Sequence, residues 1–563
     1  MRTLPALVVG SCLALGGLVV AGPTAAAPAG RTQGSASTAA AALPTRHIDF
    51  GRCQDAGLRR AGARCGFLTV PLDYSHPGGA TIRLAVSRVR HTVTAAKYQG
   101  VLLLNPGGPG GSGLTLSELG PAISRSFGRP DVGGAYDWVG FDPRGVGSSK
   151  PALSCQPHYF HGDRPDYVPT TEALYDAWQA RSTAYAKACG HAGGRLLAHL
   201  RTTDSARDMD RIRAALGAPS ITYYGFSYGT YLGQVYATLF PSRVRRMVLD
   251  SNVDPRKVWY RANLDQDVAF EHNLRAFFGW LASHDAAYHL GATRDEVMQH
   301  YDEVKSQLAA TPIQGIVGPD EWDDIFLYAG YVQFLWPELC GVFADWVSAG
   351  AGAPVVSEYR SFDSPGDDNS YAVYNGVSCT DDTWKDESFR ADQWATYAKA
   401  PFLTWGNAWF NGPCYHWPAA AHRHTTVRPR ALGRALLVDE TRDAATPYQG
   451  SLYLRSHDPR SRLVAVLGGT NHAVTPSGNA CTDRRIFDYL ATGRLPRDRP
   501  GSGADVRCPT PRLPTPDAPS SLTAGAGSAG GPAATTATPT FTTARPDAAR
   551  TWLARLLLAA GPR

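Results

Sequence analysis

No two cysteines of this 563-residue chain have the CxxC spacing, so the sequence supports neither a zinc ribbon nor a thioredoxin-type redox site. His422 and His424 stand close together, but no carboxylate or cysteine completes a metal-ligand pattern with them. The basic residues form no long run interleaved with aromatic residues, and the formal net charge of +6 is a weak bias at this length. We therefore expect no bound metal and no nucleic-acid partner.

Charged residues make up only 18% of the chain, whereas hydrophobic residues make up 43%. This balance is typical of a globular protein with a large buried core. At roughly 100–200 residues per domain, the length predicts two or three structural units.

The N-terminus has the pattern of a targeting signal. Arg2 precedes an apolar stretch from Leu4 to Val20, and small residues follow at 23–27. We interpret residues 1–27 as a secretory signal peptide, so we expect the protein to be secreted and extracellular. The alternative is a membrane anchor. It is disfavoured because a small-residue cleavage site directly follows the apolar run. The C-terminal apolar run, residues 552–560, is far shorter than the roughly 20 residues that span a bilayer, so we expect no stable membrane insertion.

Loss of the signal peptide leaves nine of the ten cysteines, and an exported protein meets an oxidising environment in which disulfides form. Spacing does not determine connectivity, so pairs can only be suggested from proximity in the sequence. The suggested pairs are Cys53–Cys65, Cys155–Cys189, Cys379–Cys414 and Cys481–Cys508. Cys340 is then left without a partner.

Strand-like runs and helical patterns alternate over residues 46–255 and again over 401–508. The strands are expected at 82–86, 101–104, 138–141, 221–224, 247–249, 435–438 and 463–467, and helices at 206–216, 231–240 and 484–490. Such alternation predicts an α/β fold with a mostly parallel sheet flanked by helices. Residues 256–400 break the rhythm and predict an inserted, mainly helical lid. The polar segments 28–45 and 509–563 are expected to be a disordered lead and a low-complexity tail.

The sequence Gly225-Phe226-Ser227-Tyr228-Gly229 lies between an expected strand and an expected helix. A GxSxG motif in this setting is a nucleophile elbow, in which a sharp turn projects the serine hydroxyl above the sheet edge. The glycines are needed because neighbouring backbone passes too close for side chains. The motif predicts Ser227 as a catalytic nucleophile; the alternative is an ordinary glycine-flanked turn.

A serine hydroxyl needs a base, and in this type of fold an acid and a histidine follow the serine in that order. His472 lies in a small-residue loop after the last expected strand, which predicts it as the base. Asp439, Glu440 and Asp443 all follow the preceding strand. We favour Asp443 because it lies deepest in the loop and has room to turn towards the histidine.

An oxyanion needs backbone donors. The N–H of Tyr228 is one candidate, and the glycine-rich loop after the strand at 101–104 offers a second at Gly107 or Gly108. This loop contains no lysine, so it does not match a phosphate-binding P-loop. A flexible surface loop is the remaining alternative.

Several motifs together resemble one family, over most of residues 48–495. They are Asn105–Gly113, Phe141–Ser149, Tyr223–Gly233, Val248–Asp250, Val253–Pro255, Ser378–Asp381, Pro413–Pro418 and Asp443–Pro447. In these residues the chain is similar to the secreted tripeptidyl aminopeptidases of actinobacteria, relatives of the prolyl aminopeptidases. The resemblance implies an α/β-hydrolase fold, residues 401–508 as a tripeptidyl-aminopeptidase-like C-terminal region, Ser227, Asp443 and His472 as a catalytic triad, and Gly107 or Gly108 in the oxyanion hole.

The resemblance also implies that carboxylates near the lid bind the free amino group of a peptide. Burying that ammonium requires such partners. The candidates are Asp381, Asp382, Glu271, Glu338 and Glu321. Two departures from the family pattern affect the expected pocket shape: Glu440 stands where glycine is usual, and Asn471 and Ala473 replace the glycines that usually flank the histidine.

Three functions remain open from the sequence. The leading hypothesis is a secreted serine exopeptidase that acts on peptides from a free N-terminus and needs no cofactor. The second is an esterase for small apolar esters, which the aromatic-rich lid would permit. The third is a secreted binding protein that keeps the fold without turnover.

Overall fold

The computed structural model describes residues 47–363, 365–384, 387–473, 475–501 and 503–516. The expected signal peptide, the whole expected lead at 28–45, and the tail from residue 517 on lie outside the described residues. Within the described residues, no helix is long and apolar enough to cross a membrane.

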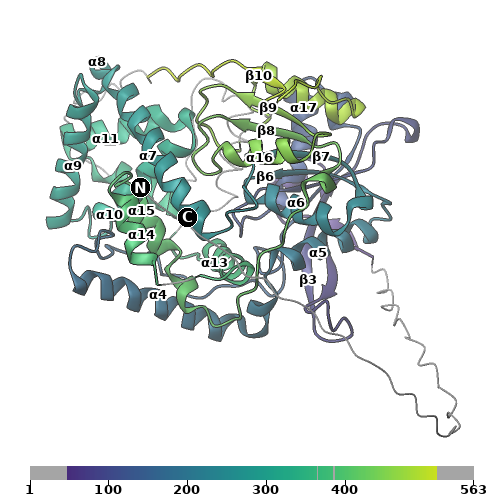
Figure 1. Cartoon of the computed structure of the whole chain (residues 1–563), viewed down its shortest axis with the longest axis horizontal. Coiled ribbons are helices and arrows are strands. Elements are labelled where there is room, and N and C mark those ends of the chain that lie inside the picture. The colour runs from purple at the N-terminus through teal and green to yellow at the C-terminus, as the bar shows by residue number, and fades with distance from the viewer. Residues whose placement is uncertain (1–46, 364, 385–386, 474, 502, 517–563) are drawn as a thin grey trace, which may run out of the picture. The chain divides into compact units, whose positions relative to one another are not determined.

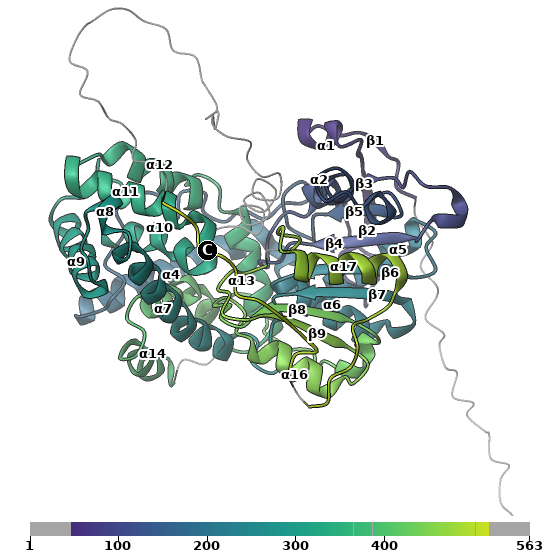
Figure 2. The same ribbon diagram turned by 90° about the horizontal axis from the view of Figure 1, so that it is seen from above.

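Ten strands of the described residues form one sheet, in the order β1-β2-β3-β5-β4-β6-β7-β8-β9-β10. Figure 2 labels β1 to β9. The strands are β1 Gly51–Arg52, β2 Arg64–Pro71, β3 Thr81–Val89, β4 Val101–Asn105, β5 Asp137–Phe141, β6 Ile221–Phe226, β7 Val244–Asp250, β8 Leu436–Glu440, β9 Arg462–Val466 and β10 Val506–Cys508. β1 to β3 pair antiparallel, as do β3 and β5, and the pairs from β5 to β10 are parallel. The sheet is therefore mostly parallel, as expected for the α/β-hydrolase fold.

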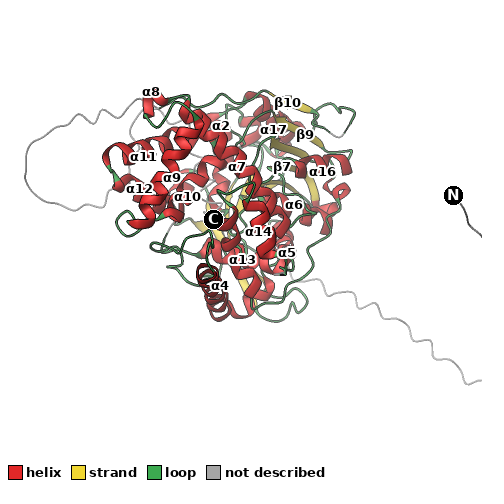
Figure 3. Ribbon diagram, turned by 60° about the vertical axis from the view of Figure 1, so that its left-hand side comes forward, coloured by secondary structure: helices red, strands yellow, loops and turns green. Residues whose placement is uncertain are grey.

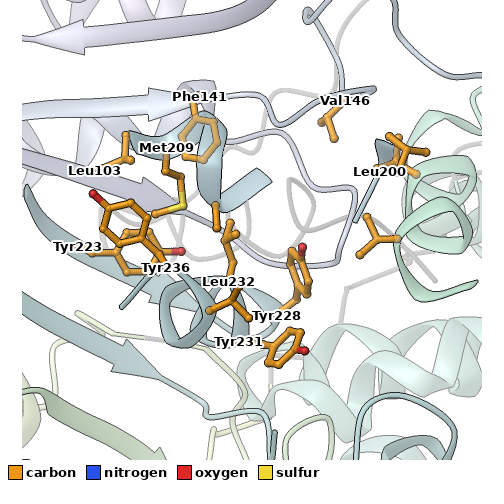
Figure 4. Packing of buried hydrophobic residues seen from close by; sticks show 14 of the residues in the cluster. Leu103, Phe141, Val146, Leu200, Met209, Tyr223, Tyr228, Tyr231, Leu232 and Tyr236 are labelled. Carbon is orange, nitrogen blue, oxygen red and sulfur yellow. The ribbon is translucent and has the colours of Figure 1, made fainter. Parts of the chain in front are cut away.

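Helices cover both faces of this sheet because successive strand residues point to opposite sides. On one face Leu103 and Tyr223 pack with α5 (Thr202–Ala215), α6 (Tyr228–Leu239) and α16 (Gln449–His457), partly visible in Figure 4. On the other face Leu102 and Tyr224 pack with α2 (Leu119–Ser126), α3 (Pro130–Gly133) and α17 (Ala480–Thr492). Central strands apolar on both faces explain why the sequence reads there as continuous apolar runs.

A helical insertion separates β7 from β8 (Figure 1). Its helices are α7 Tyr260–Ala282, α8 Asp285–Tyr288, α9 Arg294–Ala310, α10 Pro319–Tyr331, α11 Trp336–Ala349, α12 Gly352–Asp363, α13 Asn369–Asp381, α14 Phe389–Tyr397 and α15 Thr404–Phe410. Segments of α7 to α12 enclose a hydrophobic cluster of their own, and α9 to α12 lie together in Figure 3. Helical structure continues to α15, beyond the expected boundary at residue 400.

One long helix was not expected from the sequence. α4 (Glu172–Gly193) precedes β6 in the chain, yet its Trp178 packs with Trp409 of α15 in a cluster shared with the insertion. The buried residues of α4 are Trp178, Ser182, Tyr185, Ala186 and Cys189, of which three are small or polar. Small and polar residues among them hide the helical period of apolar residues. The short strand β1, the strand β2 and the short helix α1 (Ala56–Arg60) were also not expected.

The structure forms the four disulfides suggested from the sequence, Cys53–Cys65, Cys155–Cys189, Cys379–Cys414 and Cys481–Cys508. Cys340 is free and buried in the core of the insertion. Disulfides of this number are typical of proteins that fold outside the reducing cytosol.

Candidate active site

Ser227 lies at the sharp turn from β6 into α6 and has φ 54° and ψ −127°, a backbone conformation that non-glycine residues rarely adopt. The two glycines of the motif permit this turn. A Cβ on Gly225 would come within 2.5 Å of the Gly229 carbonyl oxygen, and one on Gly229 within 2.7 Å of the Asn105 carbonyl oxygen. The local geometry is that of a nucleophile elbow.

The glycine-rich loop after β4 lies against this elbow. A Cβ on Gly107, which has φ 106°, would meet the Phe226 carbonyl oxygen at 2.6 Å and the Tyr228 nitrogen at 3.1 Å. The Gly107 N–H already donates to Asn105 Oδ1 at 3.0 Å. Gly108 lines the same cavity as Ser227. Of the two expected loop donors, Gly108 therefore has the more suitable position, and Gly107 supplies the close backbone approach.

Tyr228 is the first residue of α6, so its N–H has no partner within the helix. Its backbone stands at the positive end of the helix dipole. Tyr228, Ser227 and Gly108 all line the same cavity.

The His472 ring is held by Asp443. Its Nδ1 lies 2.9 Å from Asp443 Oδ2 and 3.0 Å from Oδ1, and both side chains are buried. Thr446 donates its backbone N–H and its hydroxyl to the two oxygens of the same carboxylate, at 2.9 Å and 3.1 Å. These contacts fix the carboxylate, and His472 itself lines the cavity that contains Ser227.

The two competing acids of this region point elsewhere. Asp439 accepts a hydrogen bond from Ser451 of α16 at 2.5 Å, and burial together with the Asp443 charge raises its pKa well above the ordinary value. Glu440 accepts from the Asn471 backbone N–H at 2.7 Å, and burial raises its pKa to about 8. The structure thus brings Asp443, and neither of the other two, to the histidine.

A cavity joins the sheet edge to the insertion. Ser227, His472 and Gly108 lie on its core side. Aromatic and aliphatic residues of the insertion form much of its wall, namely Trp259, Phe270, Leu327, Tyr328, Tyr331, Tyr374, Leu403 and Phe410. The expected lid therefore lines the cavity that contains Ser227 and His472.

The expected amine-binding carboxylates do not line this cavity. Asp381 accepts from the backbone N–H of Thr202 at 2.9 Å, and burial raises its pKa to about 6. Asp382 pairs with His424 at 2.8 Å. Each is committed to a partner of its own.

The remaining candidates are also placed elsewhere. Glu271 pairs with Arg275 at 2.7 Å beside a separate cavity, and Glu321 pairs with Arg164 at 2.6 Å in the interior of the insertion. Glu338 is exposed in the first turn of α11.

The carboxylates that do line the cavity, among the described residues, include Asp254 and Asp265. Lys257 pairs with Asp265, and Arg256 pairs with Asp254. The sequence offered one signal for Asp254, its place in the motif Val253-Asp254-Pro255, but nothing that marked Asp265. Which acid on a helix faces a cavity depends on how that helix docks.

The family model described as "alpha/beta hydrolase fold" matches residues 100–474. The chain belongs to this family. It is 41% identical over 485 residues to a tripeptidyl aminopeptidase of Streptomyces lividans, covering 84% of this chain and 88% of that protein. It is 32% identical over 461 residues to the serine protease Hip1 of Mycobacterium tuberculosis, covering 77% of this chain and 86% of that protein.

A third relative, named carboxylesterase B and also from Mycobacterium tuberculosis, is 30% identical over 523 residues. The match covers 86% of this chain and 95% of that protein. Within the α/β-hydrolase family, the chain thus groups with the actinobacterial tripeptidyl aminopeptidases, and it is a serine peptidase.

Proposed function

We propose that this α/β-hydrolase is a secreted serine exopeptidase that removes short peptides, of the tripeptidyl or prolyl aminopeptidase type, from a free N-terminus. The observation that carries the proposal is the Asp443–His472 hydrogen bond at the wall of a cavity that also contains Ser227. Ser227, His472 and Asp443 act as nucleophile, base and acid.

In the first half of the reaction, His472 takes the proton of the Ser227 hydroxyl while the serine oxygen attacks the peptide carbonyl carbon. The carbonyl oxygen becomes negatively charged and accepts hydrogen bonds from the Tyr228 and Gly108 backbone. Asp443 keeps Nδ1 of the histidine protonated and stabilises the imidazolium. His472 then gives its proton to the leaving amine, and the C–N bond breaks.

In the second half, a water molecule loses a proton to His472 and attacks the acyl-enzyme ester. The same backbone donors stabilise the second tetrahedral intermediate. Its collapse returns the proton to Ser227 and releases the new carboxylate.

The exopeptidase action is supported by the two acids of the cavity wall. A free amino group carries a positive charge that loses water on entering an apolar cavity, so it needs a carboxylate partner. Asp254 and Asp265 are the anchors we propose in place of the acids expected from the sequence, which lie outside the cavity. Asp265 would exchange its partner Lys257 for the substrate ammonium.

A pair of chromogenic tripeptide anilides, one with a free and one with an acetylated amino end, tests the function. We expect the free form to be cleaved with a kcat/KM higher by about 10²-fold or more, because the acetylated form carries no charge that can pair with Asp265 or Asp254. Asp265→Asn should remove most of this preference, and Ser227→Ala should abolish both reactions. Equal rates on the two substrates would exclude recognition of the amino group.

A small-ester esterase is the second candidate, supported by the aromatic wall of the cavity. Both activities would use the same three side chains. A kcat/KM for short acyl esters far above that for any tripeptide amide would favour this candidate.

A further inference from the structure

The loops that carry Asp443 and His472 are both bonded to the insertion through one buried amide, that of Asn273 on α7. Its Nδ2 donates to the carbonyl oxygen of Arg442 at 3.0 Å and to that of Gly330 at 3.0 Å, with a longer contact of 3.5 Å to that of Thr470. Arg442 directly precedes Asp443, and Thr470 stands two residues before His472. One side chain therefore contacts the acid loop, the histidine loop and the end of α10.

The end of α10 makes further bonds to the histidine loop. The His472 backbone N–H donates to the Tyr331 carbonyl oxygen at 2.9 Å, and the Gln333 N–H donates to Asn471 Oδ1 at 2.8 Å. The Tyr331 and His472 rings meet edge to face, with centroids 5.7 Å apart. The histidine is thus attached to the insertion by backbone, side-chain and ring contacts.

The same two helices form the cavity wall. Phe270 lies on α7, three residues before Asn273, and lines the cavity. Its ring packs against that of Tyr331, with the ring centroids 4.8 Å apart. The position of the cavity wall and the position of the imidazole are therefore set by one hydrogen-bonded unit. Catalysis depends steeply on such positions, because a misplacement of about 1 Å can cost about 10²-fold in rate.

We propose that Asn273 is a positioning residue, whose amide holds the Asp443 and His472 loops in register with the insertion so that the imidazole is aligned when α7 and α10 are docked. The inference rests on the proposed function in naming those two residues as acid and base. Two amide hydrogens serve three carbonyl oxygens, so an apolar residue here leaves buried carbonyls unpaired and removes one of the contacts that hold each loop to the insertion.

The test compares Asn273→Leu, similar in size but without donors, with Asn273→Gln, which keeps the amide hydrogens. Thr404→Val is the matched control, because the Thr404 hydroxyl is buried and its bond among the described residues goes to the Ala400 carbonyl, away from both loops. For Asn273→Leu we expect kcat on a tripeptide anilide to fall about 10²-fold while KM stays within about threefold. The Gln variant should regain part of kcat, and Thr404→Val should lower Tm while leaving kcat unchanged.

The proposal is overturned if folded Asn273→Leu keeps the wild-type kcat, or if Thr404→Val loses kcat in the same proportion to its loss of Tm. Should Asn273→Leu not fold, Asn273→Ser takes its place, because the shorter side chain loses the amide that reaches the Arg442, Gly330 and Thr470 carbonyls. An unchanged kcat in that variant overturns the proposal equally.

Failure of the proposed function gives a different result. Wild-type protein would then leave tripeptide anilides intact while still hydrolysing a short acyl ester. The variants are in that case compared on the ester, for which the same loss of kcat without a change in KM is expected.

Discussion

Replacement of Glu440 by glutamine should make the protein more stable at alkaline pH. Burial raises the pKa of Glu440 from its ordinary 4.5 to about 8, so the folded protein retains a proton that the unfolded chain has lost between these values. The carboxyl group of the wild-type protein therefore contributes its full stability below about pH 4.5. That contribution is lost as the pH rises towards 8, and it is constant above that.

The size of the effect follows from the pKa difference. At about 1.4 kcal/mol per pH unit, the interval from 4.5 to about 8 corresponds to a loss of about 5 kcal/mol, as an order of magnitude. Glutamine does not titrate, and its amide oxygen can replace Oε2 as the acceptor of the Asn471 N–H. The advantage of Glu440→Gln over wild type should thus be small near pH 5 and should grow steadily to pH 8.

Urea unfolding of both proteins at intervals from pH 5 to 9 measures this difference. Glu303→Gln, the same substitution on the exposed side of α9, is the control. A difference between Glu440→Gln and wild type that stays constant over pH 5–8 would refute the reasoning, because it would mean that Glu440 is already ionised in the folded protein.

Three further changes test the site and its scaffold. Asp443→Asn should lower kcat by about 10⁴-fold in steady-state assays, since the histidine loses its orienting carboxylate, whereas an equal loss from Asp439→Asn would contradict the assignment. Gly107→Ala should lower kcat by about 10²–10³-fold by displacing the oxyanion loop, and Gly100→Ala, also at positive φ but with open space around it, should not. Replacing Cys379 and Cys414 together by serine should reduce the free energy of unfolding by about 4 kcal/mol in urea, as expected for a sequence separation of 35 residues; an unchanged midpoint would contradict this.

The sheet and the elbow were predictable from the sequence because they depend on local patterns. Short apolar runs such as 101–104 become strands buried on both faces, and glycines two residues either side of Ser227 indicate the turn. The order of the motifs along the chain also placed Asp443 and His472, which the structure brings together.

The residues that line the cavity were not predictable in the same way. Asp381 looks like any acid of the insertion until its bonds to Thr202 are seen, and Asp265 faces the cavity only through the docking of α7. α4 was missed because its buried face is rich in small and polar residues. Asn273 carries no local signal, since its three carbonyl partners come from separate parts of the chain.

The chain order of β7, the insertion and β8 has a consequence for when activity can arise. The nucleophile is synthesised before the insertion, and the acid and histidine only after it. A nascent chain, or one truncated within the insertion, therefore contains the proposed nucleophile Ser227 but lacks the proposed base His472. With the proposed triad, peptide hydrolysis therefore requires synthesis of the chain as far as His472, beyond the whole insertion.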